Sequence, residues 1–155
     1  MSVKLVQAAT ARALTLTTAE SCTGGMVAAA ITDVAGSSAV FARGYVTYSN
    51  AAKVEMLGVS PATLGAVGAV SEEVAREMAE GARTRAGADI AVAITGIAGP
   101  GGSEHKPEGR VCFAVATQGG TMAQTVEFGA PGRAQVRARS RDHALALLLR
   151  SVIDT

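Results

Sequence analysis

Apolar residues recur along the chain with two spacings, one typical of helices and one typical of strands. Residues 3–14 place apolar side chains three and four positions apart, and residues 14–18 alternate within a β-branched run. These spacings predict a helix followed by a short strand. Small apolar residues over 23–34 then predict a buried helix that ends near Gly36. The turn between this strand and this helix should lie at the carboxyl edge of a sheet, where ligand sites form.

The middle of the chain continues the alternation of strands and helices. Residues 41–49 are rich in aromatic and β-branched side chains, which favour a second strand. Three helix starts follow, because residues that cap helices occur at Asn50, at Ser60-Pro61 and at Ser71. We therefore expect three helices between the second strand and the next one.

The second half of the chain predicts three more strands. Residues 90–95 are almost wholly apolar, as in a strand that is covered on both faces. Residues 110–117 and 122–128 predict two strands that meet at Gly119-Gly120, a signal for a β-hairpin. Such a hairpin would add antiparallel pairing to the sheet.

Length and element order together predict the fold class. A last helix is expected over residues 133–153, which begin basic and end apolar. The 155 residues are the usual size of one domain, and a hydrophobic share of 48% is enough for a full core. We predict a single domain over residues 1–155 with a three-layer α/β/α fold. Its sheet should be mixed and mainly parallel, with a C-terminal β-hairpin.

Charge and composition argue against several partners. The formal net charge is +1, aromatic residues make up 3% of the chain, and Trp is absent. Nucleic-acid surfaces use clustered basic side chains and aromatic stacking, so no nucleic-acid partner is expected. No apolar run reaches the roughly 18 residues of a membrane span, and the N-terminus lacks a signal-peptide pattern. Cys22 and Cys112 form no metal-binding CxxC pair. We expect a soluble, cytoplasmic protein with no membrane partner and no metal.

Two glycine-rich turns each follow a predicted strand, at residues 20–25 (E-S-C-T-G-G) and 96–102. Exposed amides in such turns can bind a phosphate or another oxyanion. Neither turn matches the phosphate-loop pattern GxxxxGK[ST] or the dinucleotide pattern GxGxxG. The nucleophile-elbow pattern GxSxG is absent too, because Ala19 occupies its first glycine position. These mismatches argue against a nucleoside triphosphatase and an α/β-hydrolase.

The first turn holds three side chains that can act as nucleophiles: Ser21, Cys22 and Thr23. A thiol is chemically the better nucleophile, but a small buried Cys beside a helix start is commonly a packing residue. Thr23 is most simply the N-cap of the following helix. Glu20 either orients a group of the site or caps that helix, and the spacing leaves both open.

A serine nucleophile needs a neighbouring base. His105 and His143 are the two histidines, and a solvated surface position is the simpler interpretation of each. Lys53 follows the second predicted strand, and a lysine can act as a base when burial lowers its pKa. From spacing alone, a solvated first-turn lysine is still the simpler interpretation of Lys53.

Four long motifs follow one another along the chain: T-A-E-S-C-T-G-G, G-Y-V-T-Y-S-N-A-A-K-V-E-M-L-G-V, A-V-S-E-E-V-A and A-I-T-G-I-A-G-P-G-G. Over nearly the whole chain the sequence resembles the CinA-type C-terminal domain family, in a stand-alone form. The resemblance implies an amidase (a hydrolase) of pyridine nucleotide salvage and NAD metabolism. It would convert nicotinamide mononucleotide to nicotinic acid mononucleotide and ammonia with a serine nucleophile and without a cofactor or metal. It also implies a homo-oligomer.

The resemblance also implies roles for individual residues. Ser21 would be the nucleophile, and Tyr48 and Lys53 would transfer protons. Residues expected to bind substrate are Glu20, Thr23, Gly24, Gly25, Asn50, Thr95, Gly96, Arg133 and Arg137. One of the two arginines would meet the substrate phosphate. A catalytically silent nucleotide-binding or regulatory domain, or an amidase for another small amide, are the alternatives.

Overall fold

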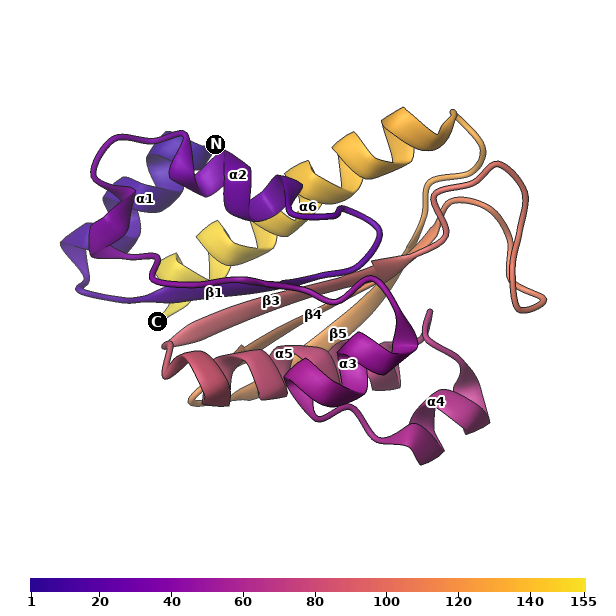
Figure 1. Ribbon diagram of the computed structural model, residues 1–155. Helices are drawn as coiled ribbons and strands as arrows, with labels where there is room; N and C mark the ends of the chain where they lie inside the picture. Colours follow the sequence, from indigo (N-terminus) through magenta and orange to yellow (C-terminus); the bar gives the residue numbers. More distant parts are fainter.

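The computed structural model describes residues 1–155 and shows three layers, with helices on both faces of one sheet (Figure 1). The strands of the sheet are β1 Leu16–Glu20, β2 Tyr45–Val46, β3 Ile90–Gly96, β4 Arg110–Thr117 and β5 Gly120–Glu127. Their spatial order is β2-β1-β3-β4-β5. Strands β2, β1 and β3 pair in parallel, and the hairpin β4–β5 adds two antiparallel pairs. Only β4 runs against the other strands, so the predicted fold class is confirmed.

The helices divide between the two faces of the sheet (Figure 1). One face is covered by α1 Ser2–Ala11, α2 Met26–Thr32 and α6 Arg133–Asp154. The other face is covered by α3 Asn50–Leu57, α4 Pro61–Val67 and α5 Glu72–Ala86. A short 3-10 helix, Ser37–Ala39, follows α2. None of these helices combines the length and the apolar character that crossing a membrane requires.

Strand β3 separates two apolar cores, as expected for a strand covered on both faces. Val92 and Ile94 belong to the core beneath α1, α2 and α6, whereas Ala91 and Ala93 belong to the core beneath α5. All four residues are fully buried. This division follows from the strand geometry, because successive strand residues point to opposite faces of the sheet.

Some predicted element bounds differ from the structure. The helix expected over 23–34 begins only at Met26, because Gly24 (φ +58°) and Gly25 (φ +106°) have left-handed backbone conformations that no α-helix contains. The strand expected over 41–49 is reduced to β2, since only Tyr45 and Val46 pair with β1 as a ladder. The turn that carries Ser21 is therefore longer and less regular than its sequence indicates.

All three predicted helices are present, and the predicted capping residue is correct for two of them. The hydroxyl oxygens of Ser60 and Ser71 accept hydrogen bonds from the first-turn amides of α4 and α5, as expected. Asn50 is not a cap, however, and that prediction is wrong. The Oγ atom of Ser49 accepts a hydrogen bond from the Ala52 amide at 3.0 Å, so Asn50 is the first residue of α3.

Candidate active site

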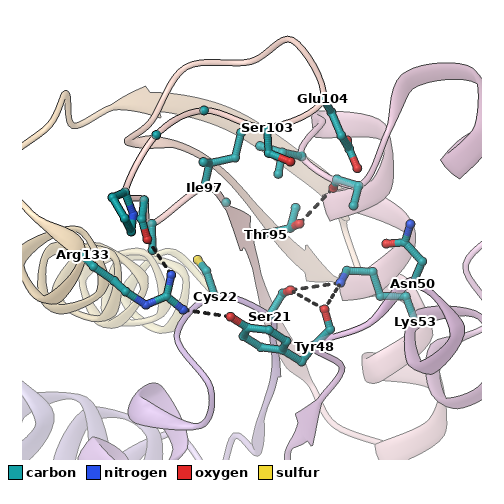
Figure 2. Close-up of a pocket in the computed structure, with 18 residues that line it drawn as sticks. Ser21, Cys22, Tyr48, Asn50, Lys53, Thr95, Ile97, Ser103, Glu104 and Arg133 are labelled. Carbon is teal, nitrogen blue, oxygen red and sulfur yellow. Dashed lines mark hydrogen bonds between the residues drawn. The ribbon is translucent and has the colours of Figure 1, made fainter.

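A cavity of about 380 Å³ lies at the carboxyl ends of β1 and β3 (Figure 2). Ser21 enters it directly after β1, Lys53 reaches it from α3, and the segment after β3 forms the opposite wall. The predicted site residues that line it are Ser21, Tyr48, Asn50, Lys53, Thr95, Gly96 and Arg133. Those that do not line it are Glu20, Thr23, Gly24, Gly25 and Arg137. Strand order brings the segments that carry the first group to one edge of the sheet, because carboxyl ends of parallel strands share that edge.

Lys53 is buried and contacts Ser21 directly. Its Nζ atom donates hydrogen bonds to Ser21 Oγ at 3.0 Å, to the Thr47 carbonyl at 2.8 Å and to the Tyr48 carbonyl at 3.2 Å. Only 1% of Lys53 is exposed, and this burial lowers its pKa from 10.5 to about 8. The interpretation of Lys53 as a solvated lysine is therefore wrong.

The surroundings of Lys53 suit a general base. A neutral amine has two hydrogens and one lone pair, and two of its three neighbours are carbonyl oxygens, which only accept. The carbonyls of Thr47 and Tyr48 therefore take the two hydrogens, and the lone pair is left for the hydroxyl hydrogen of Ser21. With a pKa of about 8, about a tenth of the Lys53 amines are neutral at pH 7. The pair can thus remove the proton that makes a serine a poor nucleophile.

Glu20 holds the turn between β1 and α2 from inside. Its carboxylate accepts hydrogen bonds from the amides of Gly25 at 3.2 Å, Val27 at 2.9 Å and Ala28 at 3.0 Å. This geometry decides between the two roles considered for Glu20, in favour of the helix cap. Thr23 is not the cap, because its buried Oγ1 has no hydrogen-bond partner. A threonine side chain cannot reach past two glycines in left-handed conformations, whereas the Glu20 carboxylate does.

Two amides of the same turn remain without a partner. The Ser21 amide donates to the Ile94 carbonyl, and the Gly24 amide donates to the Ser21 carbonyl. The amides of Cys22 and Thr23 donate no hydrogen bond within the protein. Unpaired amides that directly follow a nucleophile are the groups that stabilise an oxyanion in acyl transfer.

Cys22 is unsuited to act as the nucleophile itself. Burial raises the pKa of its thiol from 9.0 to about 11, so the thiol stays protonated at neutral pH. The Cys22 side chain lines the cavity (Figure 2), but Lys53 contacts Ser21 Oγ. The geometry therefore favours Ser21 over its neighbour.

Tyr48 contributes two different groups to the site. Its main-chain carbonyl contacts Lys53, whereas its hydroxyl accepts a hydrogen bond from Arg133 Nη2 at 2.9 Å (Figure 2). The side chain is 60% exposed. Arg133 also donates from Nη1 to the Gly99 carbonyl at 2.7 Å, so one guanidinium joins the two sides of the cavity mouth. The hydroxyl of Tyr48 makes no hydrogen bond to Ser21 or Lys53, and its part in proton transfer stays a prediction.

Arg137 lies outside the cavity, beneath the turn that carries Ser21. Its Nε atom donates to the Cys22 carbonyl at 3.0 Å, and Nη2 donates to the Thr23 carbonyl at 3.4 Å. From the sequence, Arg133 and Arg137 are equal candidates for binding the substrate phosphate. In the structure Arg133 lies at the cavity mouth, whereas Arg137 contacts the backbone of the turn that carries Ser21.

The wall opposite Ser21 is the glycine-rich loop, residues 97–109. Lys106 Nζ donates to the carbonyls of Val67 and Val70, both at 2.6 Å, and ties this loop to the segment around the start of α5. At the end of β3, Thr95 Oγ1 donates to the Ala69 carbonyl at 2.9 Å and fixes the same segment. The sequence does not predict that Lys106 anchors this loop. The only signal for it is that the chain has just three lysines, Lys4, Lys53 and Lys106.

Neither histidine lines the cavity, and the prediction of a solvated surface position is correct for His105 but wrong for His143, which is half-buried. His105 is exposed at the tip of the glycine-rich loop. His143 lies on α6 with its ring centroid 4.5 Å from that of Phe113, and its Nε2 is 3.0 Å from Gln124 Oε1. Burial lowers the pKa of His143. Of the side chains considered as a base, only Lys53 contacts Ser21.

Fold and site together define a class: a three-layer α/β/α domain with a buried serine–lysine pair at the carboxyl edge of its parallel strands. The sequence model of the CinA C-terminal domain matches residues 1–152. The chain therefore belongs to the CinA C-terminal domain family, as its motifs indicated.

Individual relatives are similar over most of this chain. A putative competence-damage inducible protein of Symbiobacterium thermophilum is 55% identical over 152 residues, which cover 92% of this chain but only 35% of that protein. The nicotinamide-nucleotide amidohydrolase PncC of Escherichia coli (strain K12) is 55% identical over 149 residues, covering 96% of this chain and 90% of that protein. A solved competence-damaged protein (CinA) superfamily structure from Klebsiella pneumoniae 700603 has a TM-score of 0.95 at 41% identity, covering 99% of this chain and 96% of that chain.

Proposed function

We propose that this protein is a nicotinamide-nucleotide amidohydrolase, which converts nicotinamide mononucleotide and water to nicotinic acid mononucleotide and ammonia. The observation that carries the proposal is the 3.0 Å contact between the buried amine of Lys53 and the hydroxyl of Ser21 at the cavity. Relatives of nearly the same length from Escherichia coli and Enterobacter agglomerans, 55% and 51% identical, are named for this activity.

The proposed reaction begins with attack of Ser21 Oγ on the carboxamide carbon, while the Ser21 proton moves to neutral Lys53. The tetrahedral intermediate then collapses, and the Lys53 ammonium protonates the departing nitrogen, which leaves as ammonia. Water attacks the acyl-serine and gives its proton to Lys53, and the carboxylic acid product leaves as Lys53 returns a proton to Ser21. One base thus serves both halves of the reaction. The carbonyls of Thr47 and Tyr48 hold the Lys53 amine in the same place throughout.

The negative charge that develops on the carboxamide oxygen needs donors. The unpaired amides of Cys22 and Thr23 are the groups we assign to it, because they directly follow the nucleophile. One such donor is commonly worth about 3 kcal/mol of transition-state stabilisation. In this assignment Thr23 acts through its backbone, not through its side chain.

Arg133 is the residue we assign to the substrate phosphate. It lines the cavity and has no carboxylate partner, whereas Arg137 is directed at backbone carbonyls outside the cavity. Asn50, Thr95 and Gly96 line the remaining wall and are the proposed contacts for the rest of the substrate. A cavity of about 380 Å³ is within the usual range for small-molecule sites.

Ammonia release tests the proposal directly, with nicotinamide mononucleotide, nicotinamide riboside and nicotinamide as substrates and Ser21→Ala as the blank. We expect rapid release from the mononucleotide, slower release from the riboside and the least from nicotinamide. Equal rates for the mononucleotide and the riboside would show that the phosphate is not recognised. No release from any of the three would instead favour a catalytically silent nucleotide-binding domain.

Two further expectations from the family stay predictions: association into a homo-oligomer, and a cytoplasmic role in pyridine nucleotide salvage. Analytical ultracentrifugation of the purified protein measures the first. Nicotinic acid mononucleotide levels in cells with and without the active protein measure the second.

A further inference from the structure

Arg137 makes its hydrogen bonds only to the backbone of the turn that carries the nucleophile. We call residues 21–25 the nucleophile turn. The guanidinium donates to two consecutive carbonyls of this turn, those of Cys22 and Thr23, across 115 and 114 positions of sequence. Arg137 is half-buried and comes from α6, so the last helix reaches back to the first strand–helix junction of the chain.

The charge of Arg137 has no carboxylate partner. The ion pairs of the protein are Arg110–Glu127, Arg141–Asp142 and Arg150–Asp154. A half-buried guanidinium without a counter-ion polarises the peptide groups that it contacts, because a charged donor strengthens the hydrogen bonds in line with it. The turn thus has a fixed positive charge on its carbonyl side.

Gly24 makes this approach of the arginine feasible. Its φ of +58° is a left-handed conformation, and a Cβ atom at this position would lie 3.3 Å from Arg137 Nη2. The glycine therefore serves both the backbone path of the turn and the space that the guanidinium occupies. This is a use for the T-G-G segment that does not involve substrate.

Peptide geometry connects the arginine to the proposed oxyanion site. In a trans peptide unit the C=O and N–H bonds point in opposite directions. When Arg137 holds the Cys22 carbonyl, the Thr23 amide of the same unit points away from the arginine and donates to nothing in the protein. Fixing the carbonyl therefore also fixes the direction of this unpaired amide.

We propose that Arg137 is a positioning residue that orients the Thr23 amide of the nucleophile turn for the oxyanion, and that it does not bind the substrate phosphate. The inference rests on the proposed function in one respect, that Ser21 attacks a carbonyl group. It assigns different tasks to two arginines one helical turn apart: Arg133 faces the cavity, and Arg137 faces the turn beneath Ser21.

Steady-state kinetics of Arg137→Ala, Arg137→Lys and Arg133→Ala on nicotinamide mononucleotide and nicotinamide riboside test the inference. Arg139→Ala is the matched control, because Arg139 is exposed on the same helix and makes no hydrogen bond. We expect Arg137→Ala to lower kcat about 10- to 100-fold on both substrates and to change each KM little, since a lost oxyanion donor costs about 100-fold or more. Added guanidinium ion should restore part of kcat in Arg137→Ala but not in Arg133→Ala.

Arg137→Lys should recover little activity, because a single ammonium cannot span two consecutive carbonyls as a planar guanidinium does. Arg133→Ala should raise KM for the mononucleotide more than for the riboside. A rise in KM for the mononucleotide alone in Arg137→Ala would overturn the inference and assign the phosphate to Arg137. A loss of activity that only follows a lowered folded fraction, measured by thermal denaturation, would overturn it as well.

Covalent labelling of Ser21 by a fluorophosphonate separates this inference from the proposed function. The phosphoryl oxygen of the probe needs the same amides but none of the nicotinamide contacts. If the unmodified protein releases no ammonia, the proposed substrate is wrong, yet slower labelling in Arg137→Ala than in Arg139→Ala still supports the positioning role. Equal labelling rates in these two variants would refute it.

Discussion

The nucleophile turn, residues 21–25, and the glycine-rich loop, residues 97–109, both follow parallel strands of the sheet, yet different contacts hold them in place. Two charged side chains hold the nucleophile turn. The Glu20 carboxylate accepts hydrogen bonds from three amides at the end of the turn and the start of α2, and Arg137 donates to two carbonyls of the turn. The glycine-rich loop extends beyond the sheet (Figure 1) and is tied down by long side chains, chiefly Lys106.

The difference follows from what each segment has to do in the proposed reaction. The nucleophile turn holds reacting groups, which lose rate when they shift by as little as about 1 Å. The glycine-rich loop forms the wall toward substrate, which must admit and release a molecule. A fully buried carboxylate and a half-buried guanidinium therefore fix the first segment, whereas no fully buried charged side chain holds the second.

The largest effect is expected at the reacting pair. Ser21→Ala and Lys53→Met should each lower kcat/KM at least about a thousandfold, because one removes the nucleophile and the other the base. Ammonia release measures the loss, and circular dichroism checks that the fold is kept. Activity within tenfold of the unmodified protein in Ser21→Ala would exclude Ser21 as the nucleophile, and the same result in Lys53→Met would exclude Lys53 as the base.

Loss of charge at Glu20 should destabilise the protein far more than the same change in the glycine-rich loop. Glu20→Gln leaves three amides with a neutral acceptor in place of a buried carboxylate, which should cost about 3 kcal/mol of unfolding free energy. Glu108→Gln, which affects one contact to the Gly101 amide, should cost less than about 1 kcal/mol. Urea denaturation measures both, and equal losses would contradict the contrast.

The pKa of Lys53 predicts how activity depends on pH. Only neutral Lys53 can accept the Ser21 proton, so kcat/KM should rise about tenfold per pH unit below about 8 and level off above it. Initial rates between pH 6 and 9.5 measure this profile. An activity that is flat from pH 6 to 8 would show that Lys53 is not the base.

The same pKa predicts a change in stability with pH. Folding lowers the pKa of Lys53 from 10.5 to about 8, so between these values the unfolded chain binds more protons and stability rises with pH. Relative to Lys53→Met, the unmodified protein should gain up to about 3 kcal/mol of unfolding free energy from pH 7.5 to pH 10.5. Chemical denaturation at both pH values measures the difference, and a constant difference would mean that Lys53 is not desolvated.

The smallest effect is expected from the anchor of the glycine-rich loop. Lys106→Met removes the two contacts to the carbonyls of Val67 and Val70 but leaves the reacting groups in place. KM for the mononucleotide should rise a few-fold, to about tenfold at most, with little change in kcat. Hydrogen exchange over residues 99–106 should speed up in parallel. A larger fall in kcat than rise in KM would give the loop a part in the chemistry.

Much of the architecture follows from local sequence. The alternation of strand and helix patterns, the wholly apolar β3 and the hairpin at Gly119-Gly120 are properties of neighbouring residues, and the structure has each of them. The caps at Ser60 and Ser71 were predictable for the same reason, because the cap and the amide that it binds lie two or three positions apart. The sequence by itself therefore determined the fold class and placed two glycine-rich turns at one edge of the sheet.

Tertiary structure decided which side chains act there. The pKa of Lys53 depends on the burial of its side chain in the folded protein, and its contact with Ser21 joins residues 32 positions apart. Arg137 reaches the nucleophile turn across more than a hundred residues, and Glu20 instead of Thr23 caps α2 because two glycines carry the backbone away from the threonine. The position of Lys53 along the chain shows neither that its side chain is buried nor which distant groups it meets. Tertiary packing buries Lys53, and it places Arg133 at the cavity but Arg137 against the backbone of the nucleophile turn.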